Sequence, residues 1–139
     1  MILIEQLAEF FEKQGIGTKN TSIHPGQMPS SPDNVVVIRN SGGYDPHPEV
    51  RLANPTFQVM VRDVLEPDAI KKSWKIYAEL NRKHMLKLEE KDGEEDDDRI
   101  TLRWCYALAP PQSLGPDENN RILYVTNYRT SVFESDLID

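Results

Sequence analysis

A chain of 139 residues with a formal net charge of −7 is long enough for one folded domain, and its acidic surface repels nucleic acid. Hydrophobic residues make up 38% of the chain and charged residues 28%, which indicates a globular protein with a somewhat polar surface. Cys105 is the sole cysteine, which excludes an intrachain disulfide and a cysteine-based zinc site and favours a reducing compartment. We therefore expect a single domain over residues 1–139.

The first predicted element is a helix over residues 2–14. Its apolar side chains recur at helical spacing, with acids on the other face: Leu3, Leu7, Phe10 and Phe11. Gly15 suits the end of this helix. The same stretch lacks the basic region and cleavage site of a signal peptide, and no segment approaches the roughly 20 apolar residues of a membrane-spanning helix. We therefore expect neither export nor membrane insertion.

Residues 18–34 contain three prolines and are predicted to be mainly loop. The sequence VVVIR at residues 35–39 is β-branched and apolar, which predicts a strand buried on both faces. An irregular arm follows over residues 40–55, rich in glycine, proline and charge. The next strand alternates, and we expect one set to face the helices and the other to face away: Phe57, Val59 and Val61, then Gln58, Met60 and Arg62.

A second helix is predicted over residues 67–86, since Pro67 suits a first helical turn. The segment EEKDGEEDDD, residues 89–98, has eight acids and is predicted to be a solvated loop. Two alternating strands complete the chain; their marker residues are Ile100, Leu102, Trp104, Tyr106 and Leu108, then Tyr124, Thr126, Tyr128 and Thr130. The order α-β-β-α-β-β predicts an α+β fold, with a small antiparallel sheet of about four strands and two helices on one face.

No group of residues matches a catalytic motif. The acidic segment has carboxylates for Mg²⁺ or Ca²⁺, but DGEEDDDRI lacks the spacing of an EF-hand, and a nuclease also needs a positioned lysine or histidine. His24, His47 and His84 are scattered, with His84 expected near the end of the second helix. Neither Ser41 nor Cys105 lies in a nucleophile motif. We therefore predict no catalytic residues, no metal site and no cofactor.

Several motifs occur in a characteristic order. After the amphipathic first helix come GQMPSSPDNVVVIRNSGG at residues 26–43, NPTFQVMVRD at residues 54–63, and a helix through SWKIYAEL. This order, over about residues 2–135, resembles the minor capsid or tail terminator proteins of long-tailed bacteriophages and prophages. One departure is Pro25, just before GQMP, where a better strand is expected for this family.

The resemblance implies a virion protein that forms a ring, usually hexameric, at the head-proximal end of the tail tube. Such a ring stops tube growth and contacts the head-completion or connector proteins, while DNA passes through it without specific binding. The protein would be made in the host cytoplasm and would need no membrane. One alternative is a head–tail connector or neck protein of another kind. A different class, a metal-dependent nuclease, would show Mg²⁺-dependent DNA cleavage that is lost when Asp96, Asp97 and Asp98 are replaced together.

The resemblance also gives the irregular arm a role. An arm with few apolar residues buries little surface of its own, so we expect residues 41–54 to be mobile in a free subunit and ordered against a neighbour in a ring. The residues expected at this assembly interface are Gly42, Gly43, Tyr44, Pro46, Arg51, Arg62, Tyr128 and Arg129.

Overall fold

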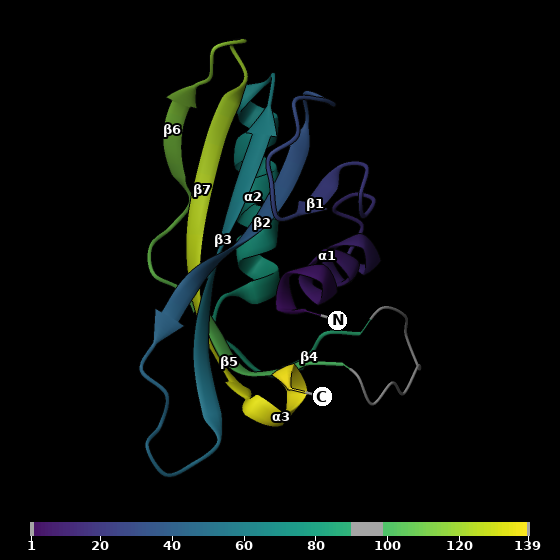
Figure 1. The fold of residues 1–139 in the computed structure, drawn as a ribbon. Coiled ribbons are helices and arrows are strands. Elements are labelled where there is room, and N and C mark those ends of the chain that lie inside the picture. The colour runs from purple at the N-terminus through teal and green to yellow at the C-terminus, as the bar shows by residue number, and fades with distance from the viewer. Residues whose placement is uncertain (1, 90–98, 139) are drawn as a thin grey trace.

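The structure, a computed structural model, describes residues 2–89 and 99–138 (Figure 1). Its elements in chain order are α1 (Leu3–Lys13), β1 (Ile23–Pro25), β2 (Val35–Tyr44), β3 (Leu52–Asp63), α2 (Glu66–Leu80), β4 (Lys83–Lys87), β5 (Thr101–Ala107), β6 (Gln112–Pro116), β7 (Ile122–Phe133) and α3 (Glu134–Leu137). Among these helices, none has the length and apolarity that crossing a bilayer requires.

All the described strands belong to one seven-stranded sheet with the order β1-β2-β3-β7-β5-β4, and β6 pairs with β7. The pairing of β1 with β2 is parallel and the other pairings are antiparallel, so the sheet is mixed. The expected small antiparallel sheet of about four strands, in the order α-β-β-α-β-β, is therefore wrong. Three short strands, β1, β4 and β6, account for the difference.

The second helix ends earlier than its sequence predicts. α2 stops at Leu80, and the Asn81 side chain accepts a hydrogen bond of 2.9 Å from the backbone N–H of Ala107. Arg82 then adopts a left-handed conformation with φ of 58°, which reverses the chain into β4. As a result His84 lies in a strand opposite Trp104 and not near a helix end, which corrects its predicted position.

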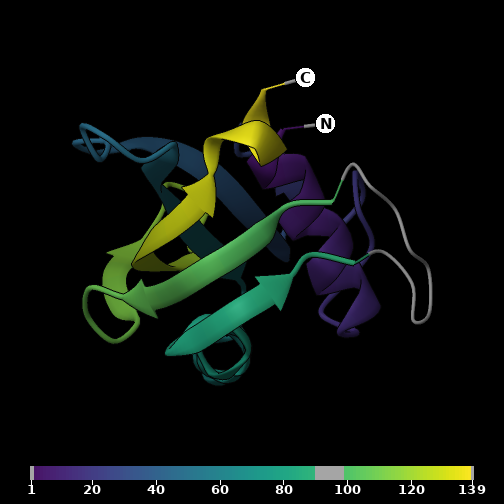
Figure 2. The same ribbon diagram turned by 90° about the horizontal axis from the view of Figure 1, so that it is seen from below.

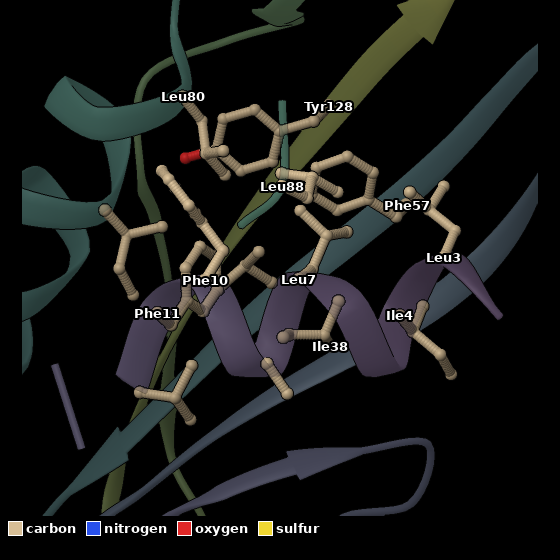
Figure 3. Close-up of a cluster of buried hydrophobic side chains, with 14 of the residues drawn as sticks. Leu3, Ile4, Leu7, Phe10, Phe11, Ile38, Phe57, Leu80, Leu88 and Tyr128 are labelled. Carbon is tan, nitrogen blue, oxygen red and sulfur yellow. The ribbon is translucent and has the colours of Figure 1, made fainter. Parts of the chain in front are cut away.

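One face of the sheet packs on α1 and α2 and forms the main core (Figure 3). The rings of Phe57 on β3 and Tyr128 on β7 stack in it, with centroids 5.2 Å apart. Val59 and Val61 share this face with Phe57, as their alternation predicts. The sheet thus buries its apolar stripe against two helices that are far apart in the sequence.

The opposite face of β2 is also buried. Val36 and Ile38 belong to the main core, whereas Val35 and Val37 point the other way and are 0% exposed. The prediction of a strand buried on both faces is confirmed for these residues, while Arg39 is exposed. The proline-rich loop of residues 26–34 lies on this second face, since three of its carbonyls bind Arg62, the pairing partner of Val35.

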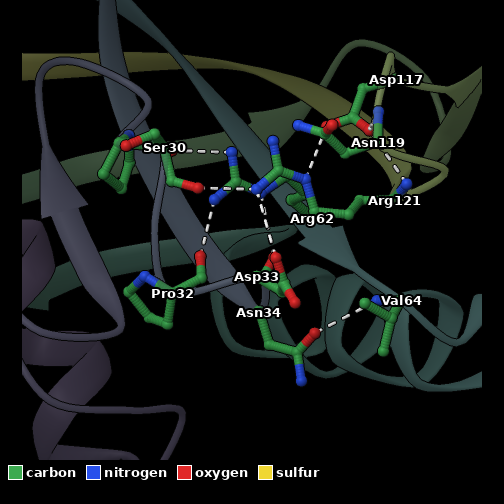
Figure 4. A network of polar contacts seen from close by, with 10 residues as sticks. Ser30, Pro32, Asp33, Asn34, Arg62, Val64, Asp117, Asn119 and Arg121 are labelled. Carbon is green, nitrogen blue, oxygen red and sulfur yellow. Dashed lines mark hydrogen bonds and ion pairs between the residues drawn. The ribbon is translucent and has the colours of Figure 1, made fainter.

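Two buried arginines hold that loop to the sheet (Figure 4). Arg62 donates to three backbone carbonyls of the loop, with Nε–O of 2.9 Å to Asp33, Nη1–O of 2.7 Å to Pro29 and Nη2–O of 2.6 Å to Pro32. Arg121 adds a bond of 2.7 Å to the carbonyl of Ser30. Arg62 thus faces away from the helices, as its alternation predicts, but it is enclosed and not exposed.

Replacing Val59 tests the strand register. Its side chain is 2% exposed, so Val59→Asp places an unpaired charge in the core and should cost more than about 3 kcal/mol of the free energy of unfolding. Thermal melting measures this loss. Gln58→Asp, at the adjacent position on the other face, is the control and should melt near the wild type; equal melting of Val59→Asp and the wild type would show that the register is wrong.

Arg62→Met tests the hold on the loop. Loss of three charged hydrogen bonds to carbonyls should lower the free energy of unfolding by about 2–4 kcal/mol and open residues 26–34 to limited proteolysis. Arg39→Met is the matched control, because Arg39 is exposed and, within the part of the chain that the structure describes, its guanidinium hydrogen-bonds to the sulfur of Met60 alone, at 3.7 Å. A protease-resistant loop in Arg62→Met would contradict the assignment.

Candidate interaction surface

The sheet face that points away from the helices carries a group of aromatic side chains around one arginine. We call this group, Tyr44, Trp104, Tyr106 and Arg129, the arginine–aromatic surface. The Arg129 Cζ lies 3.7 Å from the centroid of the Tyr44 ring and 5.8 Å from that of the Trp104 ring. The rings of Trp104 and Tyr106 stack with centroids 5.5 Å apart. Such contacts hold a guanidinium in place through the electron-rich ring faces.

A bulge in β5 brings the aromatic residues to this face. The pairing of β5 with β7 shifts between Leu102 and Trp104, so Leu102 lies in the core with Cys105, while Trp104 and Tyr106 lie on the opposite face. The simple alternation of Leu102, Trp104 and Tyr106 in the sequence would have put all of them on one face. The register shift is what makes the surface aromatic.

A second bulge positions Tyr44. The pairing of β2 with β3 shifts between Asn40 and Gly43, and Gly42 has φ of 96°, which favours glycine. A Cβ on Gly43 would lie 2.7 Å from the carbonyl oxygen of Asn54, so a side chain there would force the two strands apart. These two glycines let the end of β2 bend so that Tyr44 reaches Arg129.

Arg129 is half-buried and has no anionic partner among the residues that the structure describes. Its Nε is buried without a hydrogen-bond acceptor in that part of the chain. Buried polar groups are normally satisfied, and a guanidinium pairs best with the two oxygens of a carboxylate or phosphate. The arrangement is therefore suited to binding an anion and has no evident catalytic chemistry.

The structure brings together part of the predicted interface. Gly42, Gly43, Tyr44, Pro46 and Arg51 are all exposed on the β2–β3 hairpin, and Tyr44 contacts Arg129. Arg62 and Tyr128 are 2% and 0% exposed, so they lie inside the subunit.

The sequence-predicted arm is largely strand in the structure. β2 continues to Tyr44 and β3 begins at Leu52, so the irregular part is residues 45–51. Within it, the His47 Nδ1 accepts hydrogen bonds of 3.1 Å from the backbone N–H groups of Glu49 and Val50. The arm is therefore a paired hairpin whose short tip is organised by a histidine.

The acidic segment, predicted as a solvated loop, lies outside the described residues except for Glu89. The described residues that flank it contact α1 through Arg99, which donates to the Leu88 carbonyl and binds the Glu9 carboxylate at 2.7 Å. Lys19 binds the same carboxylate at 2.8 Å. The backbone N–H of Ile100 donates to the Gln6 side chain at 2.7 Å. These contacts hold Leu88, Arg99 and Ile100 against the first helix.

No cluster of three or more metal-ligating side chains occurs in residues 2–89 and 99–138. Cys105 is buried in the core, and burial raises the pKa of its thiol to about 12, so the thiolate is scarce at neutral pH. His24, His47 and His84 lie in β1, the hairpin tip and β4, respectively.

Glu9→Gln tests the anchor of the acidic segment. Burial alone would raise the pKa of Glu9, but hydrogen bonds and charges from Lys19 and Arg99 outweigh it and hold the pKa below 4.5. Since the folded pKa is the lower one, the carboxylate stabilises the fold above pH 4.5, and this contribution is lost as pH falls through the folded pKa. The variant should lose about 2–4 kcal/mol at pH 7, since it removes the buried carboxylate that Arg99 and Lys19 both bind.

Denaturant unfolding at several pH values measures this effect. The difference between the wild type and Glu9→Gln should shrink below pH 4.5. Glu12→Gln, at an exposed position of the same helix, should show little difference at any pH. A difference for Glu9→Gln that does not vary with pH would contradict the role of the charge.

A family model described as bacteriophage tail terminator protein matches residues 10–132. The match runs from α1 to the end of β7, so it includes the proline-rich loop, both bulges and the arginine–aromatic surface. No curated protein is a significant match. The family match confirms the resemblance seen in the order of sequence motifs, and the chain belongs to the bacteriophage tail terminator family, whose members are structural proteins that complete the phage tail.

Proposed function

We propose that this protein forms a hexameric ring at the head-proximal end of the tail tube, where it ends polymerisation of the tube and joins the tail to the head. The family match over residues 10–132 carries the proposal. The hairpin and the arginine–aromatic surface support it, because they place the exposed rings of Tyr44 and Tyr106 beside Arg129, whose Nε has no hydrogen-bond acceptor among the described residues.

The contacts between copies would use the hairpin and the sheet face more than the sheet edges. β4, at one edge, carries Lys83 and Lys87, and Met85 interrupts it with a left-handed φ of 50°. β1, at the other edge, has three residues and ends at Pro25. Charged, irregular and short edge strands oppose pairing with another chain. Ring formation by simple extension of the sheet is therefore disfavoured.

The proposed partners are further copies of the chain, the tail tube protein and a head-completion or connector protein. DNA would pass through the ring without specific binding, and the net charge of −7 is compatible with a lumen that repels phosphate. Assembly would take place in the host cytoplasm and leave the protein at the head-proximal end of the virion tail. We propose a structural role without catalytic activity.

Loss of the protein tests this function. Phage particles assembled without it should carry tails of uneven and excess length that fail to join heads. Native mass measurement of the purified chain, with and without the tail tube protein, should detect a hexamer on or with the tube. Tails of normal length that attach to heads would contradict the proposal, and a different ring size would correct its stoichiometry.

A further inference from the structure

We propose that Arg129 is a carboxylate-binding site for an extended segment of a partner protein. The guanidinium binds the side chain of an aspartate or glutamate in that segment. An apolar residue two positions away, which shares a face with the acid in an extended chain, enters the cleft beside Trp104 and Tyr106. The site is formed within one subunit, so it goes beyond the proposed ring and does not depend on it.

The first argument is the state of Arg129. Its guanidinium packs against the Tyr44 ring, 3.7 Å from the centroid, and its buried Nε lacks an acceptor among the described residues. Packing on a ring uses the flat face of a guanidinium and leaves its in-plane N–H groups for an anion. This cation has lost water at Nε and gained no hydrogen bond there, so it gains more from a carboxylate than a fully hydrated arginine does.

The second argument is the pair of residues on either side of Arg129 in the sheet. Thr56 on β3 and Tyr106 on β5 lie directly opposite it, so their side chains share its face. The Thr56 Oγ1 accepts a hydrogen bond of 2.8 Å from the Ser41 hydroxyl, which leaves the Thr56 proton to be donated. The neighbours of Arg129 therefore bring a further donor to an anion and no carboxylate of their own.

The third argument is the adjoining cleft, which gives the site room for more than a charge. The cleft has a volume of about 340 Å³, and Trp104 and Tyr106 line it as well as the arginine–aromatic surface. Its other lining residues include Tyr77, Asn81 and His84. Aromatic walls with a few polar groups suit an apolar side chain whose backbone stays at the opening.

The same features favour a protein ligand over nucleic acid. A guanidinium binds phosphate as well as carboxylate, but the net charge of −7 repels a polyanion. Single-stranded nucleic acid also needs free ring faces on which its bases stack. Here Arg129 covers a face of Tyr44, and Trp104 and Tyr106 stack on each other.

Heteronuclear NMR of the isotope-labelled full chain tests the site, with the peptide acetyl-Leu-Ala-Glu-Ala-Leu-amide as the probe. The arginine Nε–H signal that disappears in Arg129→Lys identifies the site, and it should shift in a saturable way as the peptide is added. The peptide with glutamine in place of glutamate should bind at least about tenfold more weakly, because a charged hydrogen bond becomes a neutral one. Glycine in place of both leucines should weaken binding by about threefold or more, because the cleft is then left empty.

Variants of the protein give the matched comparison. Arg129→Gln should lose at least about tenfold in peptide affinity, followed by the backbone amide signals of β5 and β7. Arg39→Gln makes the same change at an exposed position of the same sheet face and should stay within about twofold of the wild type. Thermal melting establishes that each variant folds, and Arg129→Lys, which keeps the charge but not the fork of donors, carries the test if Arg129→Gln does not.

The possible outcomes are distinct. An Arg129 signal that does not respond to the peptide, or that shifts no more than the Arg39 signal, would overturn the inference, and so would equal binding of the glutamate and glutamine peptides. A stronger response to an oligothymidylate or to inorganic phosphate, at equal ionic strength, would replace the protein carboxylate by a phosphate ligand. None of these results bears on tail length or ring size, so the proposed function stands or falls separately.

Discussion

The central strand β7 forms backbone hydrogen bonds along both of its edges, and the rest of the sheet is arranged around these pairings. β3 pairs with it from Ile122 to Phe133, while β6 and β5 divide the other edge between them. Because alternate residues of a strand point to opposite faces, this frame sends Tyr128 into the helical core and Arg129 to the opposite face. The core and the arginine–aromatic surface thus rest on neighbouring residues of a single strand, and a slip of one residue would exchange them.

The second face of the sheet is covered without a second layer of helices or strands. A proline-rich loop lies on the face of the buried Val35 and Val37, and the guanidinium groups of Arg62 and Arg121 hold it there by binding its carbonyls. This solution satisfies backbone groups that a loop on a buried face would otherwise leave unpaired. It also covers only part of the face. The remainder keeps its aromatic and cationic side chains available to a partner, so the reach of the loop defines the extent of the open surface.

Local patterns in the sequence predict the helix α1, the doubly buried β2 and the alternation in β3, because each depends on residues close together in the chain. The sequence also predicts the family, because the order of several motifs is characteristic although each motif alone is weak. The short strands β4 and β6 cannot be predicted from local sequence patterns. Lys83–Lys87 consists of residues that suit a helix, and Gln112–Pro116 is polar with a glycine and a proline, so only pairing with β5 and β7 makes them strands.

The bulges are harder still, because a register shift is a property of two paired strands, and the shift in β5 is not marked by a glycine. Leu102 and Trp104 look equivalent in the sequence, yet the shift puts the first in the core and the second on the open face. The glycine-rich arm predicts that Tyr44 is exposed, and it is. Its contact with Arg129, 85 positions away in the chain, depends on the bulge between β2 and β3 and on the pairing of β2, β3 and β7.

The enclosure of Cys105 has a practical consequence. The sole thiol of the chain lies 1% exposed between the sheet and its helices, where alkylating reagents do not reach it in the folded protein. Thiol reagents should therefore leave the folded wild-type protein unlabelled. A cysteine introduced on the hairpin tip, for example at Glu49, would be the one site that a maleimide dye or a cross-linker modifies, so neighbouring subunits can be joined or followed by fluorescence without first removing a native thiol.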